Sequence, residues 1–339
     1  MSRFAIAVFL VACGDKSDDT SSSTVLPAVT WSEAFDTTAT GSLSGVWGTG
    51  PDDVFIVGGT EEKGEIYHYD GSDWGAMTVP DGLGLLVWCY GFASDDVYVV
   101  GVSGAMAHYD GSSWSAIETG TEKELWGVWG TSGSDLWIVG GDPDTDTCGD
   151  PEVEGEQACL WYYDGSTLSP YALAESENDR GATSIFKVWG VDGLLLAVGQ
   201  KGLLLEHNGS DWIRVSGGAE ANDDFVSLWG TSSADMVSVG GRSNARLATR
   251  KDGEWSTTSP SGIGGLNAVF MPQPDEAIVG GIYGWVGRYV PSTDTLEEEG
   301  ILGTTDIHAI WGDGAGRVYA VGGNFTAPHV GVAYLRVEE

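Results

Sequence analysis

Residues 141–159, GDPDTDTCGDPEVEGEQAC, form the most distinctive stretch of the chain, and their side chains have the chemistry of a metal site. Four carboxylates stand at close spacing: Asp142, Asp144, Asp146 and Asp150. Oxygen ligands at alternate positions of a loop suit Ca²⁺. The glycine and the bidentate glutamate of an EF-hand loop are out of register here, so the alternative is a solvated acidic loop. We therefore expect no cofactor, with calcium at these four residues as the alternative.

Two of the four cysteines lie in the same stretch. Cys148 and Cys159 have ten residues between them, and in an oxidising compartment such a pair forms a local disulfide. Cys89 lies in an apolar run, where a thiol usually acts as a small buried hydrophobic group. We predict one disulfide and no nucleophilic cysteine.

A repeat of about 40 residues organises the chain around these groups. Each unit has an apolar run ending in Trp-Gly, an acidic turn, a strand ending in Val-Gly, another strand, an Asp-Gly turn and a second Trp. The first aromatic recurs at intervals of 43, 39, 60, 40, 41 and 41 residues. The seven positions are Trp47, Tyr90, Trp129, Trp189, Trp229, Phe270 and Trp311. Four short strands in such a unit predict one blade of a β-propeller.

The seventh unit stops before its fourth strand, whereas residues 29–35, VTWSEAF, precede the first unit without a blade of their own. We expect this N-terminal strand to complete the seventh blade, with Trp31 in the place that Trp74 holds in the first. A ring joined in this way has no open sheet edge. The sequence therefore predicts an all-β fold, a seven-bladed β-propeller over residues 28–339 whose seventh blade is closed by the N-terminal strand.

The repeated phrases HYDGSDW, residues 68–74, and HYDGSSW, residues 108–114, are assigned to structure rather than to ligand binding. Asp can cap such a turn through its side chain, and Gly supplies a positive φ. His68, His108 and His207 share one repeat position on separate blades, so they are not expected to converge on a metal ion.

Several phrases resemble known propeller repeats. Val-Gly-Gly followed by Tyr, Asp and Trp resembles kelch repeats, most closely in residues 288–298 with Tyr289 and Leu296. The DGSxW turn resembles the Asp-box of BNR-repeat propellers, which include sialidases and Ycf48-like assembly factors, although Trp follows Asp by four positions instead of five. The phrase VWGTSxxDVxxVG resembles repeat lipoproteins of bacterial envelopes. These resemblances imply the fold but do not select a function.

An enzyme of the sialidase kind would, by that resemblance, need three arginines and a Tyr–Glu pair. Arg242, Arg246 and Arg250 gather in the fifth unit, outside the innermost strands. On those strands only Lys187 and His308 have side chains that could act as catalytic groups. Two isolated groups on separate blades do not make an active site. We predict that the protein is not an enzyme; a glycan-active BNR enzyme or a lectin is the alternative.

Two long connections fall on one sector of one propeller face. Residues 141–159 join the second and third strands of the third blade, and residues 172–184 lead on to the fourth blade. Long loops on a rigid scaffold are where binding concentrates. We predict a binding surface here that includes Trp161, Asp179 and Arg180; the alternative is that both connections are neutral surface insertions.

The N-terminus has the features of an export signal. Arg3 precedes an apolar run of nine residues, which is too short to span a bilayer. The run ends in Leu-Val-Ala-Cys13 and resembles the lipobox of bacterial lipoproteins. That resemblance implies a signal peptide over 1–13, a lipid on Cys13 and a flexible tether over 14–27. The alternative is an ordinary secretion signal.

Charge and anchor together suggest where the protein acts. A formal net charge of -35 opposes binding to nucleic acid. Gly14 replaces the Asp that retains lipoproteins at the inner membrane, so we expect the outer membrane of a bacterial envelope, or otherwise secretion. The expected function is a membrane-anchored binding or scaffolding module with an envelope protein or glycan as partner. An assembly factor for an envelope complex is a further alternative.

Overall fold

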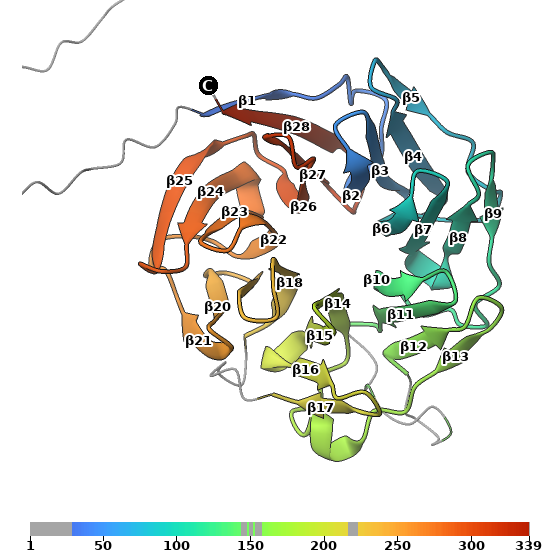
Figure 1. Cartoon of the computed structure of the whole chain (residues 1–339). Helices are drawn as coiled ribbons and strands as arrows, with labels where there is room; N and C mark the ends of the chain where they lie inside the picture. The colour runs from blue at the N-terminus through green and yellow to red at the C-terminus, as the bar shows by residue number, and fades with distance from the viewer. Residues whose placement is uncertain (1–28, 144–147, 149–151, 153–157, 216–222, 339) are drawn as a thin grey trace, which may run out of the picture.

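The computed structural model describes residues 29–338 except for 144–147, 149–151, 153–157 and 216–222. Within these residues, 28 strands form seven four-stranded antiparallel sheets arranged around a central axis (Figure 1). The predicted all-β, seven-bladed propeller is confirmed. No helix in the described part of the chain is long and apolar enough to cross a bilayer.

Each blade has four strands, named a to d from the axis outward, and the blades are numbered in chain order. The a strands are β2 (Ser42–Gly50), β6 (Leu86–Ala93), β10 (Leu125–Ser132), β14 (Ile185–Val191), β18 (Phe225–Gly230), β22 (Leu266–Gln273) and β26 (Asp306–Gly312). The b strands are β3 (Asp53–Thr60), β7 (Asp96–Gly101), β11 (Asp135–Gly140), β15 (Leu194–Gly199), β19 (Met236–Gly240), β23 (Glu276–Gly281) and β27 (Arg317–Gly323).

The c and d strands form the outer half of each blade. The c strands are β4 (Lys63–Tyr69), β8 (Met106–Tyr109), β12 (Leu160–Tyr163), β16 (Leu204–His207), β20 (Arg246–Lys251), β24 (Trp285–Val290) and β28 (Gly331–Glu338). The d strands are β5 (Trp74–Ala76), β9 (Trp114–Ala116), β13 (Leu168–Pro170), β17 (Trp212–Arg214), β21 (Glu254–Thr258), β25 (Thr295–Ile301) and β1 (Val29–Glu33). Four short 3₁₀ helices lie in connections: η1 (Val102–Gly104), η2 (Glu175–Asn178), η3 (Gln200–Gly202) and η4 (Ile282–Gly284).

Blade 7 is completed by the N-terminal strand, as predicted. Strand β1 pairs antiparallel with β28, so the first and last parts of the chain lie side by side (Figure 1). Trp31 lies opposite Arg336, which pairs with Val318. In blade 1 the corresponding row runs from Val54 through Tyr69 to Trp74. Trp31 therefore holds the place in blade 7 that was expected for it.

The Trp-Gly pairs of the a strands hold neighbouring blades together. In four blades, a Cβ on the glycine would lie within 3.0 Å of the aromatic ring of the preceding blade: Gly91 with Trp47, Gly190 with Trp129, Gly312 with Phe270 and Gly48 with Trp311. In two more, the ring donates a hydrogen bond of 3.3 Å to the glycine carbonyl: Tyr90 to Gly130 and Trp189 to Gly230. Six of the seven aromatics thus pack onto a backbone that has no side chain in the way; blade 6 has Met271 at the glycine position.

The b strands are buried on both sides by the blades around them. In β3 the residues Val54, Phe55, Ile56 and Val57 are all fully buried, and other b strands follow the same pattern. Burial on both faces removes the usual polar alternation of a strand, which is why these segments are continuous apolar runs.

The repeated Asp-Gly-Ser phrase is a turn between strands c and d. Asp70 Oδ1 accepts hydrogen bonds from the amides of Ser72 and Asp73 at 2.9 and 3.0 Å. Gly71 has a φ of +91°, which favours glycine. The same capping recurs at Asp110, Asp164 and Asn208. These residues serve the fold, as the sequence indicated.

Two of the repeated histidines also have structural partners. His68 Nε2 lies 2.7 Å from Asp53 Oδ1, and His108 Nε2 lies 2.8 Å from Asp96 Oδ1. Both pairs connect strands b and c of one blade, so the histidines of blades 1 and 2 reinforce separate sheets.

We predict that Gly190→Ala destabilises the propeller by about 1–3 kcal/mol, because the new methyl group would overlap the Trp129 ring. Its Cβ would lie 2.3 Å from that ring. Gly75→Ala is the control, since nothing lies within 4 Å of its Cβ. Urea unfolding measures both variants; equal stabilities would contradict the interblade role of the glycine.

We predict that replacing Asp70, Asp110 and Asp164 together by Asn weakens the acid sensitivity of the fold. Hydrogen bonds from the Ser72 hydroxyl and from the Asp73 and Ser72 amides lower the pKa of Asp70 from 3.8 to about 2. They favour the charged form, so their stabilisation is present above about pH 4 and is lost as the pH falls through about 2. Asn, as at position 208, caps without titrating.

The measurement is the free energy of unfolding at several pH values between about 4 and 2. The triple variant should lose less stability than the wild type over this window. Asp73→Asn is the control, because in the described structure the Asp73 carboxylate accepts no hydrogen bond in its turn. Parallel pH profiles for the wild type and the triple variant would refute the prediction.

We predict that Arg336→Met destabilises the closed ring by about 3–5 kcal/mol. Arg336, 3% exposed, donates to both Glu299 oxygens of blade 6 at 2.9 and 2.8 Å, and Trp31 Nε1 donates to the same carboxylate at 3.1 Å. The variant leaves a buried carboxylate without its ion pair. Lys63→Met is the control, because the Lys63 side chain is 76% exposed. Thermal unfolding that shifts equally in both variants would rule out a special role for this pair.

Candidate functional site

Every a strand contains one extra residue that breaks its pairing with strand b. In all seven blades the register shifts three residues before the repeated aromatic. The extra residues are Ser44, Val87, Trp126, Phe186, Val226, Asn267 and His308. A bulge of this kind bends the strand and redirects a side chain.

All seven bulge residues line a single pocket of about 300 Å³ at the axis. Pro143, Ile282 and Phe325, from b–c connections, complete the wall together with Asp306 at the start of β26. The pocket therefore opens on the face that carries the b–c and d–a connections, which we call the pocket-bearing face. The described residues of the connection from β11 to β12, among them Pro143, Cys148 and Cys159, are on the same face.

The floor of the pocket is formed by two large side chains. Trp88 and Lys187, 7% and 6% exposed, directly follow the bulges of blades 2 and 4. At the same position the other blades have only small residues: Gly45, Gly127, Ser227, Ala268 and Ala309. The Lys187 Nζ lies 2.8 Å from the centroid of the Trp88 ring, a cation–π contact. Blade 3 lies between them and contributes Gly127, which leaves room for the contact.

Lys187 is an isolated cation. Among the described residues it donates no hydrogen bond and forms no ion pair, and the nearby thiol of Cys89 is buried. Burial holds the pKa of Lys187 well below its usual range and raises the pKa of Cys89. Ser44 contributes a second unsatisfied group, since its buried Oγ also lacks a hydrogen-bond partner. The pocket therefore offers polar groups that the protein itself leaves unpaired.

Blade 7 supplies the polar groups of the facing wall, since β26 and β14 lie on opposite sides of the axis (Figure 1). His308 Nε2 donates to the Gly323 carbonyl at 2.9 Å, and its ring stacks on Phe325 with centroids 4.2 Å apart. Burial lowers the pKa of His308, which favours a neutral ring with Nδ1 as acceptor. Asp306 Oδ1 accepts from the Tyr283 amide at 2.9 Å.

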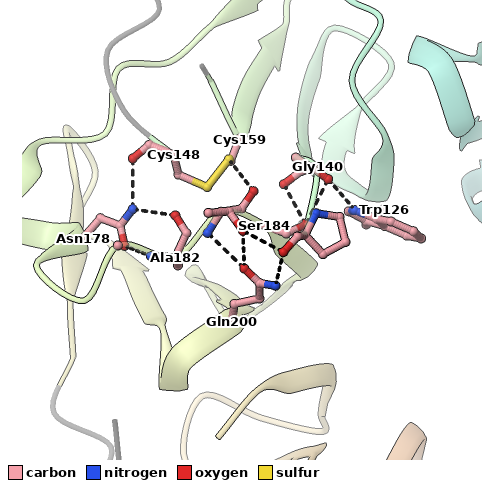
Figure 2. The surroundings of a disulfide bond; sticks show 12 residues. Trp126, Gly140, Cys148, Cys159, Asn178, Ala182, Ser184 and Gln200 are labelled. Atoms are coloured by element: carbon pink, nitrogen blue, oxygen red, sulfur yellow. Dashed lines mark hydrogen bonds between the residues drawn. A yellow bond between two sulfur atoms is a disulfide. The ribbon is translucent and has the colours of Figure 1, made fainter. Parts of the chain in front are cut away.

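The predicted disulfide between Cys148 and Cys159 is present (Figure 2). Asn178 donates to the Cys148 and Ala182 carbonyls at 3.0 and 2.9 Å, so the insertion is bonded to the connection that follows blade 3. The Pro143 carbonyl accepts hydrogen bonds from Thr183 and Gln200. These contacts fix Pro143 in the pocket wall and so link both long connections to the central pocket.

The calcium prediction falls mostly on residues that the structure does not describe. Asp144, Asp146 and Asp150 lie outside the described residues, as does Cys13. Asp142 is half-buried next to Pro143. Among the described residues, no group of three or more His, Cys, Asp or Glu side chains is placed to hold a metal ion.

The three residues of the predicted binding surface have different environments. Trp161 requires a correction: it is 3% exposed and packs in the core, so a ligand on the surface cannot contact its ring. Asp179 is paired with Arg214 of β17. Arg180 donates to the Lys201 carbonyl at 3.3 Å. Asp179 and Arg180 lie on the pocket-bearing face, but neither lines the pocket.

The rim of the pocket on blades 6 and 7 is unusually apolar. Six large hydrophobic residues are exposed in the described structure, and four of them belong to these two blades on this face: Tyr283, Phe325 and Val330 in b–c connections, and Ile301 at the end of β25. Tyr283 is 70% exposed and Phe325 also lines the pocket. Contiguous exposed apolar groups of this kind mark interaction surfaces.

Sequence reasoning treated Lys187 and His308 as unrelated and did not find the pocket. The signal was present in the repeat, because the third residue before the aromatic changes from Ser to Val, Trp, Phe, Val, Asn and His while the residue before it stays apolar. Only the register shift shows that these seven side chains turn to the axis.

Known proteins resemble this chain in fold alone. No protein-family model and no curated protein matches its sequence. Solved structures do match: a structure of YCF48 bound to D1 peptide has a TM-score of 0.62 and 12% identity over 92% of this chain and 97% of that one. YCF48 from Cyanidioschyzon merolae gives 0.63 and 15%, with 91% and 98% covered. Virginiamycin B lyase from Staphylococcus aureus gives 0.69 and 11%, with 92% and 100% covered. At these identities the likeness shows the propeller fold and leaves the function open.

Proposed function

We propose that the protein is a non-enzymatic binding propeller of the bacterial envelope that holds a protein partner on its pocket-bearing face. The observation that carries this proposal is the convergence of seven bulge residues on one pocket next to an exposed apolar rim. A propeller of similar fold is solved with a bound peptide, YCF48 with D1 peptide, which supports a protein as the partner. A role in assembling an envelope complex fits the same surface.

The position of β1 supports a membrane anchor on the opposite side. Val29 lies opposite Glu338, at the end of β28 that is remote from the b–c connections. A lipid on Cys13 would therefore attach to the face that carries the a–b and c–d turns. The pocket-bearing face would point away from the bilayer, toward partners, and Gly14 after the anchor favours the outer membrane.

The arginines of blade 5 give no support to a sialidase-like enzyme. Arg242 pairs with Asp224 and Arg246 pairs with Asp223. Arg250 donates to the Gly253 carbonyl, and none of the three lines the central pocket. Two of them are held in ion pairs and none reaches the pocket, so a carboxylate clamp built from the three has no basis here.

We predict that a photo-cross-linker at position 283 or 325 captures the same envelope protein in cells, because Phe325 lines the pocket and Tyr283 follows Ile282, which also lines it. A cross-linker at position 72, in a c–d turn on the opposite face, should not capture it. Mass spectrometry of the adducts identifies the captured protein. Capture from position 72 alone, or no capture from 283 and 325, would overturn the proposed docking face.

Substitutions of the exposed aromatic residues provide a second test of the docking face. Tyr283→Asn combined with Phe325→Ser should reduce capture from a cross-linker at position 301 about tenfold or more, since interface aromatics carry much of the binding energy. Asn tolerates the left-handed backbone of Tyr283, whose φ is +57°. Ile213→Asn removes an exposed apolar residue of strand β17 and is the matched control.

A further inference from the structure

Trp88 and Lys187 form the floor of the axial pocket. At the same position the other five blades have Gly, Ser or Ala. Neither residue is needed there by the repeat, because the fold is complete in the blades that lack them. Gly45 and Gly127 precede them around the ring, and a Cβ on either glycine would lie 3.0 and 3.5 Å from the Trp88 and Lys187 Cα atoms. The floor is thus a feature added to the propeller scaffold.

The Lys187 amine at this floor has no anion beside it, and its burial disfavours the ammonium form, which an anion in the pocket would restore. A buried lysine without a hydrogen-bonded counter-charge is costly, and the Trp88 ring offsets only part of that cost. Lys187 is 6% exposed and yet lines the pocket, so its free side is turned to the cavity. Among the pocket residues Asp306 is the only carboxylate, and its Oδ1 is already engaged by the Tyr283 amide.

The remainder of the pocket suits an apolar group. Trp126, Phe186, Phe325, Ile282 and Pro143 form most of its wall. A volume of about 300 Å³ is at the lower end for small-ligand sites. One cation matches one negative charge, and the lining contains no arginine that would help to hold a doubly charged phosphate.

We infer that the pocket binds an apolar or aromatic group that ends in a single carboxylate, with the carboxylate on Lys187 and the apolar part between Trp126, Phe186 and Phe325. Ser44 Oγ, which has no partner, is a further donor on the wall. This inference rests on the proposed binding function and adds the chemistry of the ligand. The carboxylate can belong to a free small acid or to the C-terminus of a protein whose last side chain is apolar.

The test is calorimetric titration of the full chain with 3-phenylpropionate and with 3-phenylpropanol, which has the same apolar part without the charge. Two peptides that end in phenylalanine, one with a free C-terminus and one amidated, distinguish the second source from the first. The wild type should bind the free acid, or the peptide with the free C-terminus, about 10- to 100-fold more tightly than its uncharged counterpart.

Lys187→Met provides the decisive variant, because methionine is close in size and removes the buried charge. This variant should lose the preference for the acid, with binding about 10- to 100-fold weaker, and should bind the alcohol about as well as the wild type. Its melting temperature should not fall, since an unpaired buried cation is removed. Lys63→Met removes an exposed lysine on the pocket-bearing face and is the matched control for net charge.

Equal binding of acid and uncharged probe by the wild type would overturn the inference, as would unchanged acid binding by Lys187→Met. An equal loss in Lys63→Met would assign the effect to the overall charge, and no binding of either acid would also overturn it. Capture of a partner by the wild type from positions 283 and 325 tests the docking face whatever chemical group the partner presents to Lys187. Its persistence alongside a negative titration would therefore refute the carboxylate site and leave the proposed docking face in place.

Discussion

The packing of a-strand aromatics onto the glycine of the next blade, at six of the seven blade contacts, is the interaction on which the ring depends. A buried aromatic side chain contributes about 1.5–3 kcal/mol, but only if the facing backbone allows the ring to approach. Glycine allows it, as the 2.3 Å between a Cβ at Gly190 and the Trp129 ring makes clear. Because each blade is held by its two neighbours, the last blade must also meet the first. Gly48 of blade 1 against Trp311 of blade 7 makes that contact, while strand β1 completes blade 7 and the Arg336–Glu299 pair joins blade 7 to blade 6.

The bulge in each a strand separates structural positions from positions that are free to vary. The aromatic and the glycine are fixed by interblade packing, and strand b is fixed by burial on both faces. The extra residue of the bulge has no partner in strand b, so its side chain is released from these constraints. Seven such residues converge at the axis, where a substitution changes the pocket without changing the blade. Trp88 and Lys187, next to two bulges, show how the same scaffold acquires a specific floor.

The fold could be predicted from the sequence because each blade repeats the same local pattern of apolar runs, turns and aromatic residues. The spacing of Trp47 and its equivalents counted the blades, and the unpaired segment around Trp31 indicated how blade 7 closes. The pocket could not be obtained in this way, because Trp88 and Lys187 are about a hundred residues apart and meet only after seven sheets are placed around an axis. Trp161 was misassigned for a related reason: it lies outside the repeated aromatic positions, yet it pairs with Ile138 and is covered by the core.

The strong negative charge of the protein restricts what its central pocket can hold. A chain with a formal net charge of -35 repels anions at long range, although salt screens this field beyond about 8 Å. A polyanion would meet that repulsion with only one lysine to offset it at the floor. A monoanion with a large apolar part gains most of its binding energy from burial against Trp126 and Phe186, which the field does not weaken. Charge and shape therefore act together, since the field disfavours multiply charged ligands and the unpaired Lys187 favours an acid over its neutral counterpart.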